Sequence, residues 1–148
     1  RTQSSGNILV SNIQAVSNGK KTWDFRYDEE INFQVDCEAR EQSDGLLFYM
    51  ALQEPLTTDV ITNFKVVVKE DAVVKGEKIS GTVTGSAKTV RIGQFLLYFA
   101  IGDAKQTRWY DVVDNNVNLP ALNITAIDMD PHTNSGLFSV PYKLNINN

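Results

Sequence analysis

Apolar and polar side chains alternate along most of this chain, in short runs that end at turn-forming residues. In residues 22–27 large aromatic side chains occupy every second position, with hydroxyl or charged side chains between them. Residues 31–37 repeat the pattern, with Ile31, Phe33 and Val35 on one side. A period of two is typical of a strand that has one buried face. The pattern therefore predicts a chain built from β-strands.

We expect about nine strands, because no stretch shows the periodicity of an amphipathic helix. Asn18-Gly19 and residues 43–45 mark two of the turns, and Gly81 is expected to form a β-bulge. Short strands at this spacing predict an all-β, antiparallel β-sandwich of immunoglobulin-like or jelly-roll topology. The expected strands lie within residues 7–16, 22–27, 31–37, 46–53, 60–69, 78–84, 93–101, 106–113, 117–127 and 137–144.

Length and composition fit a single globular domain covering residues 1–148. Hydrophobic residues make up 42% of the chain and charged residues 22%, which argues against disorder. The formal net charge is -4, so the chain lacks the basic surface on which nucleic-acid binding depends. The same acidity disfavours anionic membrane surfaces.

Cys37 is the only cysteine, so a disulfide within the chain is impossible. We expect it to be a small buried side chain in a reducing compartment. No apolar run approaches the roughly 20 residues that span a bilayer, and the polar start shows no signal peptide. Because there is no initiating Met, we expect a C-terminal fragment of a longer protein.

The residues for most kinds of catalysis are missing from the sequence. His132 is the only histidine and lies in a turn-like segment, so neither a nucleophile–base pair nor a zinc site is expected. The candidate calcium ligands, residues 128–130 and residues 111–116, lack EF-hand spacing and are interpreted as solvated corners. There is no glycine-rich phosphate loop. We therefore predict no catalytic residues, no cofactor and no metal.

Aromatic side chains on strands are the remaining candidates. A pyranose ring has apolar C–H faces and hydroxyl edges, so it binds to flat aromatic rings flanked by polar groups. If alternation buries Phe48 and Phe99, it turns Tyr49 and Tyr98 outward. Alternatively, such aromatics pack under loops or in a dimer interface. The expected platform combines Tyr49 and Tyr98 with Trp109 or Tyr110 and with Arg91 or Arg108. These six are the candidate carbohydrate-binding residues.

The order of features resembles the C-terminal domain of Wzt, the nucleotide-binding subunit of ABC transporters that export bacterial O-antigen polysaccharide. Two positions depart from the family pattern: Asp28-Glu29 replaces a common Gly-Glu pair, and Phe95 replaces a tyrosine. The matching segments are an opening glycine and strand (GNILVSNI, residues 6–13), NG (18–19) with FRYDEEI (25–31), GQFLL (93–97), WYD (109–111) and GLFSVP (136–141).

The resemblance implies a cytoplasmic, dimeric carbohydrate-binding module at the inner face of the bacterial inner membrane. Such a domain recognises the modified non-reducing terminus of an O-antigen polysaccharide and couples chain termination to export. Its partners would be that terminus, a second copy of the chain and, through a separate ATPase domain, the membrane subunit of the ABC transporter. An anionic cap would pair with Arg91 or Arg108.

Two other classes of function stay open. One is a structural or adhesive sandwich, such as a virion or pilus-like domain, that binds no sugar. The other is a hydrolase, which only the abundance of carboxylates suggests, because with 18 acidic residues some pair would be available by chance. A homodimer is expected both from the resemblance and from the nearly continuous apolar run at residues 46–52.

Overall fold

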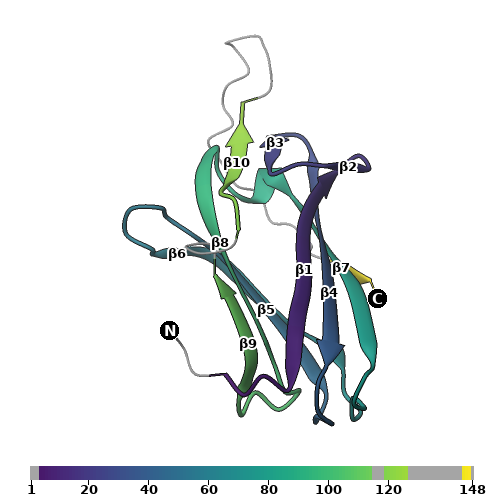
Figure 1. Ribbon diagram of the computed structural model, residues 1–148. Helices are drawn as coiled ribbons and strands as arrows, with labels where there is room; N and C mark the ends of the chain where they lie inside the picture. The colour runs from purple at the N-terminus through teal and green to yellow at the C-terminus, as the bar shows by residue number, and fades with distance from the viewer. Residues whose placement is uncertain (1–3, 115–118, 127–144, 148) are drawn as a thin grey trace.

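The computed structural model describes residues 4–114, 119–126 and 145–147 of the chain, and these residues form two facing β-sheets (Figure 1). The predicted all-β sandwich is confirmed. The first sheet has the order β11 (Asn145–Asn147), β7 (Lys78–Ser86), β4 (Glu30–Ala39), β1 (Ile8–Ser17) and β2 (Lys20–Lys21).

The second sheet carries the candidate residues Tyr49, Tyr98 and Trp109. Its order is β3 (Asp24–Arg26), β10 (Leu122–Thr125), β8 (Gly93–Gly102), β5 (Leu46–Gln53) and β6 (Val60–Lys69). A further strand, β9 (Trp109–Asp114), also pairs with β8, next to the half of β8 that β10 leaves open. The strand pairs are antiparallel except β3 with β10, which are parallel.

Alternation decides which side chains fill the space between the sheets. Along β4 the buried positions are the odd ones from Ile31 to Ala39, as the sequence pattern predicts. Cys37 is among them and is 2% exposed, which confirms it as a buried side chain. From the second sheet, Phe48 and Phe99 meet in the core with ring centroids 5.2 Å apart.

Several predicted strands are confirmed, and β5 and β6 match their predicted bounds. The bulge expected at Gly81 is wrong, because Gly81 pairs with Val35 in an unbroken register between β4 and β7. A short 3-10 helix, Ala87–Thr89, precedes β8. The strand predicted at residues 137–144, and with it His132 and residues 128–130, lies outside the described residues.

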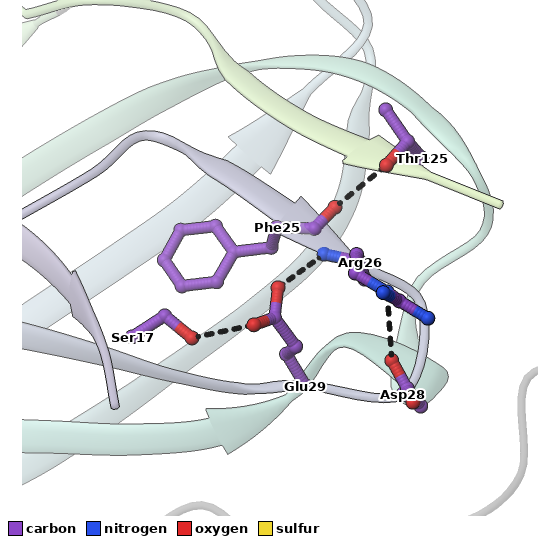
Figure 2. A network of polar contacts seen from close by, with 6 residues as sticks. All are labelled: Ser17, Phe25, Arg26, Asp28, Glu29 and Thr125. Carbon is purple, nitrogen blue, oxygen red and sulfur yellow. Dashed lines mark hydrogen bonds and ion pairs between the residues drawn. The ribbon is translucent and has the colours of Figure 1, made fainter. Parts of the chain in front are cut away.

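A polar network joins the two sheets near one end of the sandwich (Figure 2). The Ser17 hydroxyl at the end of β1 donates to Glu29 Oε2 at 3.1 Å, and the backbone N–H of Arg26 in β3 donates to Glu29 Oε1 at 2.6 Å. One carboxylate thereby connects a strand of each sheet. Beside it, Thr125 Oγ1 donates to the carbonyl of Phe25, whose ring is buried in the core.

The chain enters the sandwich beside β9 and then crosses to the other sheet (Figure 1). The backbone N–H groups of Ser5 and Gly6 donate to the carbonyls of Trp109 and Tyr110 at 3.0 and 2.8 Å. Further along, the N–H of Val10 donates to the Asp111 carboxylate at 3.0 Å. Backbone hydrogen bonds and one acidic side chain therefore connect β9 to β1 and to the segment that precedes β1.

The apolar run that suggested a dimer is accounted for within one chain. Strand β5 lies between β6 and β8, so its inward side chains Leu46, Phe48 and Met50 are in the core. On the outward face, Leu47 and Ala51 are each only 2% exposed, because neighbouring side chains cover them. This run no longer favours an interface between copies.

Candidate functional site

Three aromatic side chains gather on the outward face of the second sheet, and we call them the aromatic cluster: Tyr49 of β5, Tyr98 of β8 and Trp109 of β9. The Tyr49 ring lies 6.0 Å from the Tyr98 ring and 5.9 Å from the Trp109 rings, centroid to centroid, with interplanar angles of 73° and 51°. Because Ala51 pairs with Tyr98 and Tyr49 with Ala100, the two tyrosines are diagonal neighbours. Each ring is half-buried, so part of its surface faces solvent.

A bulge in β9 turns Trp109 outward and Tyr110 inward. Ile101 pairs with Asp111 but Gly102 pairs with Trp109, so β9 has one residue more than β8 at this point. Tyr110 is 1% exposed, and its hydroxyl donates to the Gly45 carbonyl at 3.0 Å. Burial raises the pKa of the Tyr110 hydroxyl above its ordinary value. The expectation that Tyr110 belongs to the surface platform is therefore wrong.

Gly102 makes room for the Trp109 rings. A Cβ atom at this position would lie 3.1 Å from Trp109 Cε3 and 2.7 Å from the carbonyl oxygen of Arg108. Real Cβ atoms almost never approach backbone as closely as the second distance. The missing side chain lets the indole lie across β8 toward Tyr49.

A shallow depression of about 470 Å³ borders the aromatic cluster, and we call it the aromatic hollow. Ala51, 2% exposed, lies at its floor, since its short side chain leaves space between Tyr49 and Tyr98. Polar side chains complete the lining: Gln53 from β5, and Asn63 and Lys65 from β6. Lys65 Nζ lies 5.9 Å from the centre of the Tyr49 ring, within range of a cation–π interaction.

A second, smaller depression of about 170 Å³ lies on the other side of Trp109, and we call it the donor hollow. Lys65 and Trp109 line both hollows. The turn between β8 and β9 supplies Gln106 and Arg108, while Leu47 and Gly102 contribute from the sheet. The Lys65 ammonium donates to Gln106 Oε1 at 3.1 Å.

The buried carboxylate of Asp103 shapes this turn. It accepts hydrogen bonds from the N–H and the hydroxyl of Thr107 and from the N–H of Arg108. Burial alone would raise the pKa of Asp103, but these hydrogen bonds outweigh it, so the pKa lies below its ordinary value. Gln106 has a φ of 62°, in the left-handed region that non-glycine residues seldom adopt.

The two candidate arginines lie in different places. Arg108 lines the donor hollow beside Trp109, as the platform hypothesis requires. Arg91 instead pairs with Glu54 and lies over the Phe95 ring, 5.2 Å from its centroid. It lines neither hollow, so the expectation that Arg91 joins the aromatic platform is wrong.

Six polar residues that line the two hollows were not among the sequence candidates: Gln53, Asn63, Lys65, Asp103, Gln106 and Thr107. Asn63 and Lys65 could have been found, because they alternate with the inward Phe64 and Val66 on a strand that a short loop joins to β5. Gln53 likewise alternates with Leu52. Gln106 had no comparable signal, since its place depends on a left-handed turn.

The described residues include no group of three or more His, Cys, Asp or Glu side chains placed to hold a metal ion. Cys37 is not a reactive thiol, because burial first, and the nearby charges of Asp36 and Asp111 second, raise its pKa to about 12. Within this same part of the chain, no helix has the length and apolar character needed to cross a bilayer.

Comparison with known proteins supports the fold. No family model matches the sequence, and no curated protein matches it. Among solved structures, the chain is similar to the C-terminal domain of Wzt, with a TM-score of 0.69 and 12% identity over 86% of this chain and 78% of that one. The predicted resemblance to that domain is confirmed at the level of the fold.

A second solved structure, the β-glucosidase from Listeria innocua in complex with gluconolactone, aligns with a TM-score of 0.40 and 10% identity. The match covers 80% of this chain but 16% of the glucosidase. A TM-score this low supports no inference about this chain.

Proposed function

We propose that this domain is a non-catalytic carbohydrate-binding module and that the aromatic cluster with its two hollows is the binding site. The observation that carries the proposal is the outward arrangement of Tyr49, Tyr98 and Trp109 beside polar side chains. Partly exposed rings offer apolar surface to the C–H face of a sugar, and the amides of Gln53 and Asn63 reach its hydroxyl groups.

The sequence resemblance and the shared fold support a narrower role. We propose that the ligand is the modified non-reducing terminus of an O-antigen polysaccharide, and that binding it couples chain termination to export. In this role the domain belongs to a protein with a separate ATPase domain, which works with the membrane subunit of an ABC transporter at the cytoplasmic face of the inner membrane.

The decisive experiment is calorimetric titration with O-polysaccharide from the source bacterium, with its terminal cap and after removal of the cap. We expect binding to the capped chain alone. Trp109→Ala and Tyr98→Ala should each weaken binding about tenfold or more, equivalent to ~1.4 kcal/mol, because each removes half-buried ring surface. Leu56→Ala is the control variant, since Leu56 is 96% exposed in the loop between β5 and β6.

The possible results distinguish three parts of the proposal: the location of the site, the recognition of the chain terminus and carbohydrate binding itself. Binding that survives both aromatic substitutions would refute this site but not the module. Equal binding to capped and uncapped chains would refute terminus recognition. No binding to either polymer would favour the structural or adhesive class of function.

A homodimer stays part of the proposal, on the strength of the resemblance alone. Sedimentation over a wide concentration range tests it, and a monomer at the highest concentration would contradict it.

A further inference from the structure

The two hollows meet at a shared boundary but differ in chemistry. Lys65 and Trp109 line both, so a bound chain could pass from one hollow to the other without leaving the sheet surface. The aromatic hollow presents ring faces beside the amides of Gln53 and Asn63, whereas the donor hollow, among the described residues, has no aromatic ring besides Trp109 and presents Lys65, Gln106 and Arg108 around the Asp103 turn. A ligand that fills both must therefore have an apolar face at one point and acceptor oxygens beside it.

The donor hollow is held in shape by buried groups. Asp103 is 5% exposed and binds three donors of the same turn, which fixes the backbone of Thr107 and Arg108. Gln106 is held in a left-handed conformation, and its N–H donates to the Asp103 carbonyl at 3.0 Å. Residues held in such conformations occur preferentially at ligand-binding sites.

The charges of the donor hollow point to an acceptor-rich ligand. Asp103 directs its carboxylate into the turn, where its hydrogen-bond partners are Thr107 and Arg108. Among the described residues, neither Lys65 nor Arg108 has a carboxylate within ion-pair distance. The Lys65 ammonium gives one of its three N–H donors to Gln106 Oε1, so its other donors, those of Arg108 and the Gln106 amide N–H groups can be given to oxygen atoms of a ligand.

We propose that the site binds two consecutive sugar residues, one in each hollow, with Trp109 between them. One ring stacks on the aromatic cluster above Ala51. Its neighbour enters the smaller donor hollow and accepts hydrogen bonds from Lys65, Gln106 and Arg108. This inference rests on the proposed function and adds that the unit recognised is a linked pair of residues.

Oligosaccharides of one to four residues, cut by partial acid hydrolysis from the O-polysaccharide, are the probes. When these probes are titrated into the wild-type protein, the affinity should rise about tenfold or more from one sugar residue to two and then level off. Arg108→Ala and Gln106→Asn should remove most of that rise, so that each weakens binding of the two-residue probe far more than binding of the one-residue probe. Asparagine is chosen because it tolerates the left-handed conformation while being too short to reach the same position.

Lys78→Ala on β7, in the other sheet, is the matched control for loss of a surface cation. Thermal unfolding of each variant checks that the protein remains folded. Arg108→Ala removes a cation from the donor hollow, whereas Gln106→Asn shortens an amide side chain, so the two variants test the hollow independently.

A flat affinity profile beyond one residue, or equal weakening of all probe lengths by Arg108→Ala and Gln106→Asn, would overturn the inference. If Trp109→Ala abolishes binding while the length profile stays flat, only the two-residue inference fails. If the wild-type protein binds neither polysaccharide nor fragments, the proposed function fails with it.

Discussion

Gly102 offers the sharpest test of how the aromatic cluster is built. Replacing it with alanine places a Cβ atom 2.7 Å from the Arg108 carbonyl oxygen and 3.1 Å from Trp109 Cε3. The indole can rotate away from this atom, but the carbonyl can move only with the backbone of β9. Overpacking of this kind costs about 1–3 kcal/mol. Loss of the contact between Trp109 and Tyr49 adds about 0.5–1.5 kcal/mol.

Urea unfolding measures the sum of these two costs, and Trp109 fluorescence reports the displacement of the indole directly. In a Trp23→Phe background Trp109 is the only tryptophan, so its emission reports the position of this indole. We expect Gly102→Ala to lower the free energy of unfolding by about 2–4 kcal/mol and to shift Trp109 emission toward the red. Sugar binding should weaken in parallel.

A double variant separates the two clashes. With Trp109→Ala already present, Gly102→Ala can clash only with the Arg108 carbonyl, so its cost should fall below its cost in the wild-type protein. An unchanged urea midpoint together with unchanged Trp109 emission in the single variant would refute the steric reasoning. An equal cost in both backgrounds would show that the backbone clash alone matters.

Three further predictions concern buried groups that are not part of the aromatic cluster. Tyr110→Phe removes the hydroxyl that donates to Gly45, and should destabilise the fold by about 1–3 kcal/mol in urea without changing sugar affinity. The lowered pKa of Asp103 contributes stability above the ordinary value of 3.8, and this is lost as pH falls through the folded-state pKa. The Asp103→Asn variant should therefore be less stable than the wild-type protein at pH 7 and should lose less stability between pH 5 and pH 2. The same dependence of the unfolding free energy on pH in both proteins would contradict this. Cys37 should resist a thiol reagent at pH 8 until urea unfolds the chain, and rapid labelling of the native protein would disprove its burial.

Alternation along single strands was the dependable signal in the sequence. It placed Phe48 and Phe99 in the core and Tyr49 and Tyr98 outside it, because both strands keep an unbroken period of two where these residues lie. It could not decide between Trp109 and Tyr110, because a bulge shifts the period by one residue at this point. Nothing in the local pattern marks that bulge, since it forms opposite Gly102 in a different strand.

Contacts between distant residues were beyond the reach of the pattern. The sequence offered Arg91 and Arg108 as alternatives for the platform, yet Arg91 pairs with Glu54, directly after β5. The donor hollow depends on Lys65 of β6 meeting Gln106 of the turn between β8 and β9. Such a meeting follows from strand order, which alternation does not specify.

The hydrogen bonds from Ser5 and Gly6 to the carbonyls of Trp109 and Tyr110 have a mechanical consequence. Any pull on the chain ahead of Ser5 is borne first by these bonds, and so by the strand that carries Trp109. Tension at this point would loosen one wall of both hollows before it reached the core. Conversely, a ligand bound against Trp109 would stabilise the hydrogen bonds that hold the N-terminal segment, so that the stability of the site and that of this attachment are coupled.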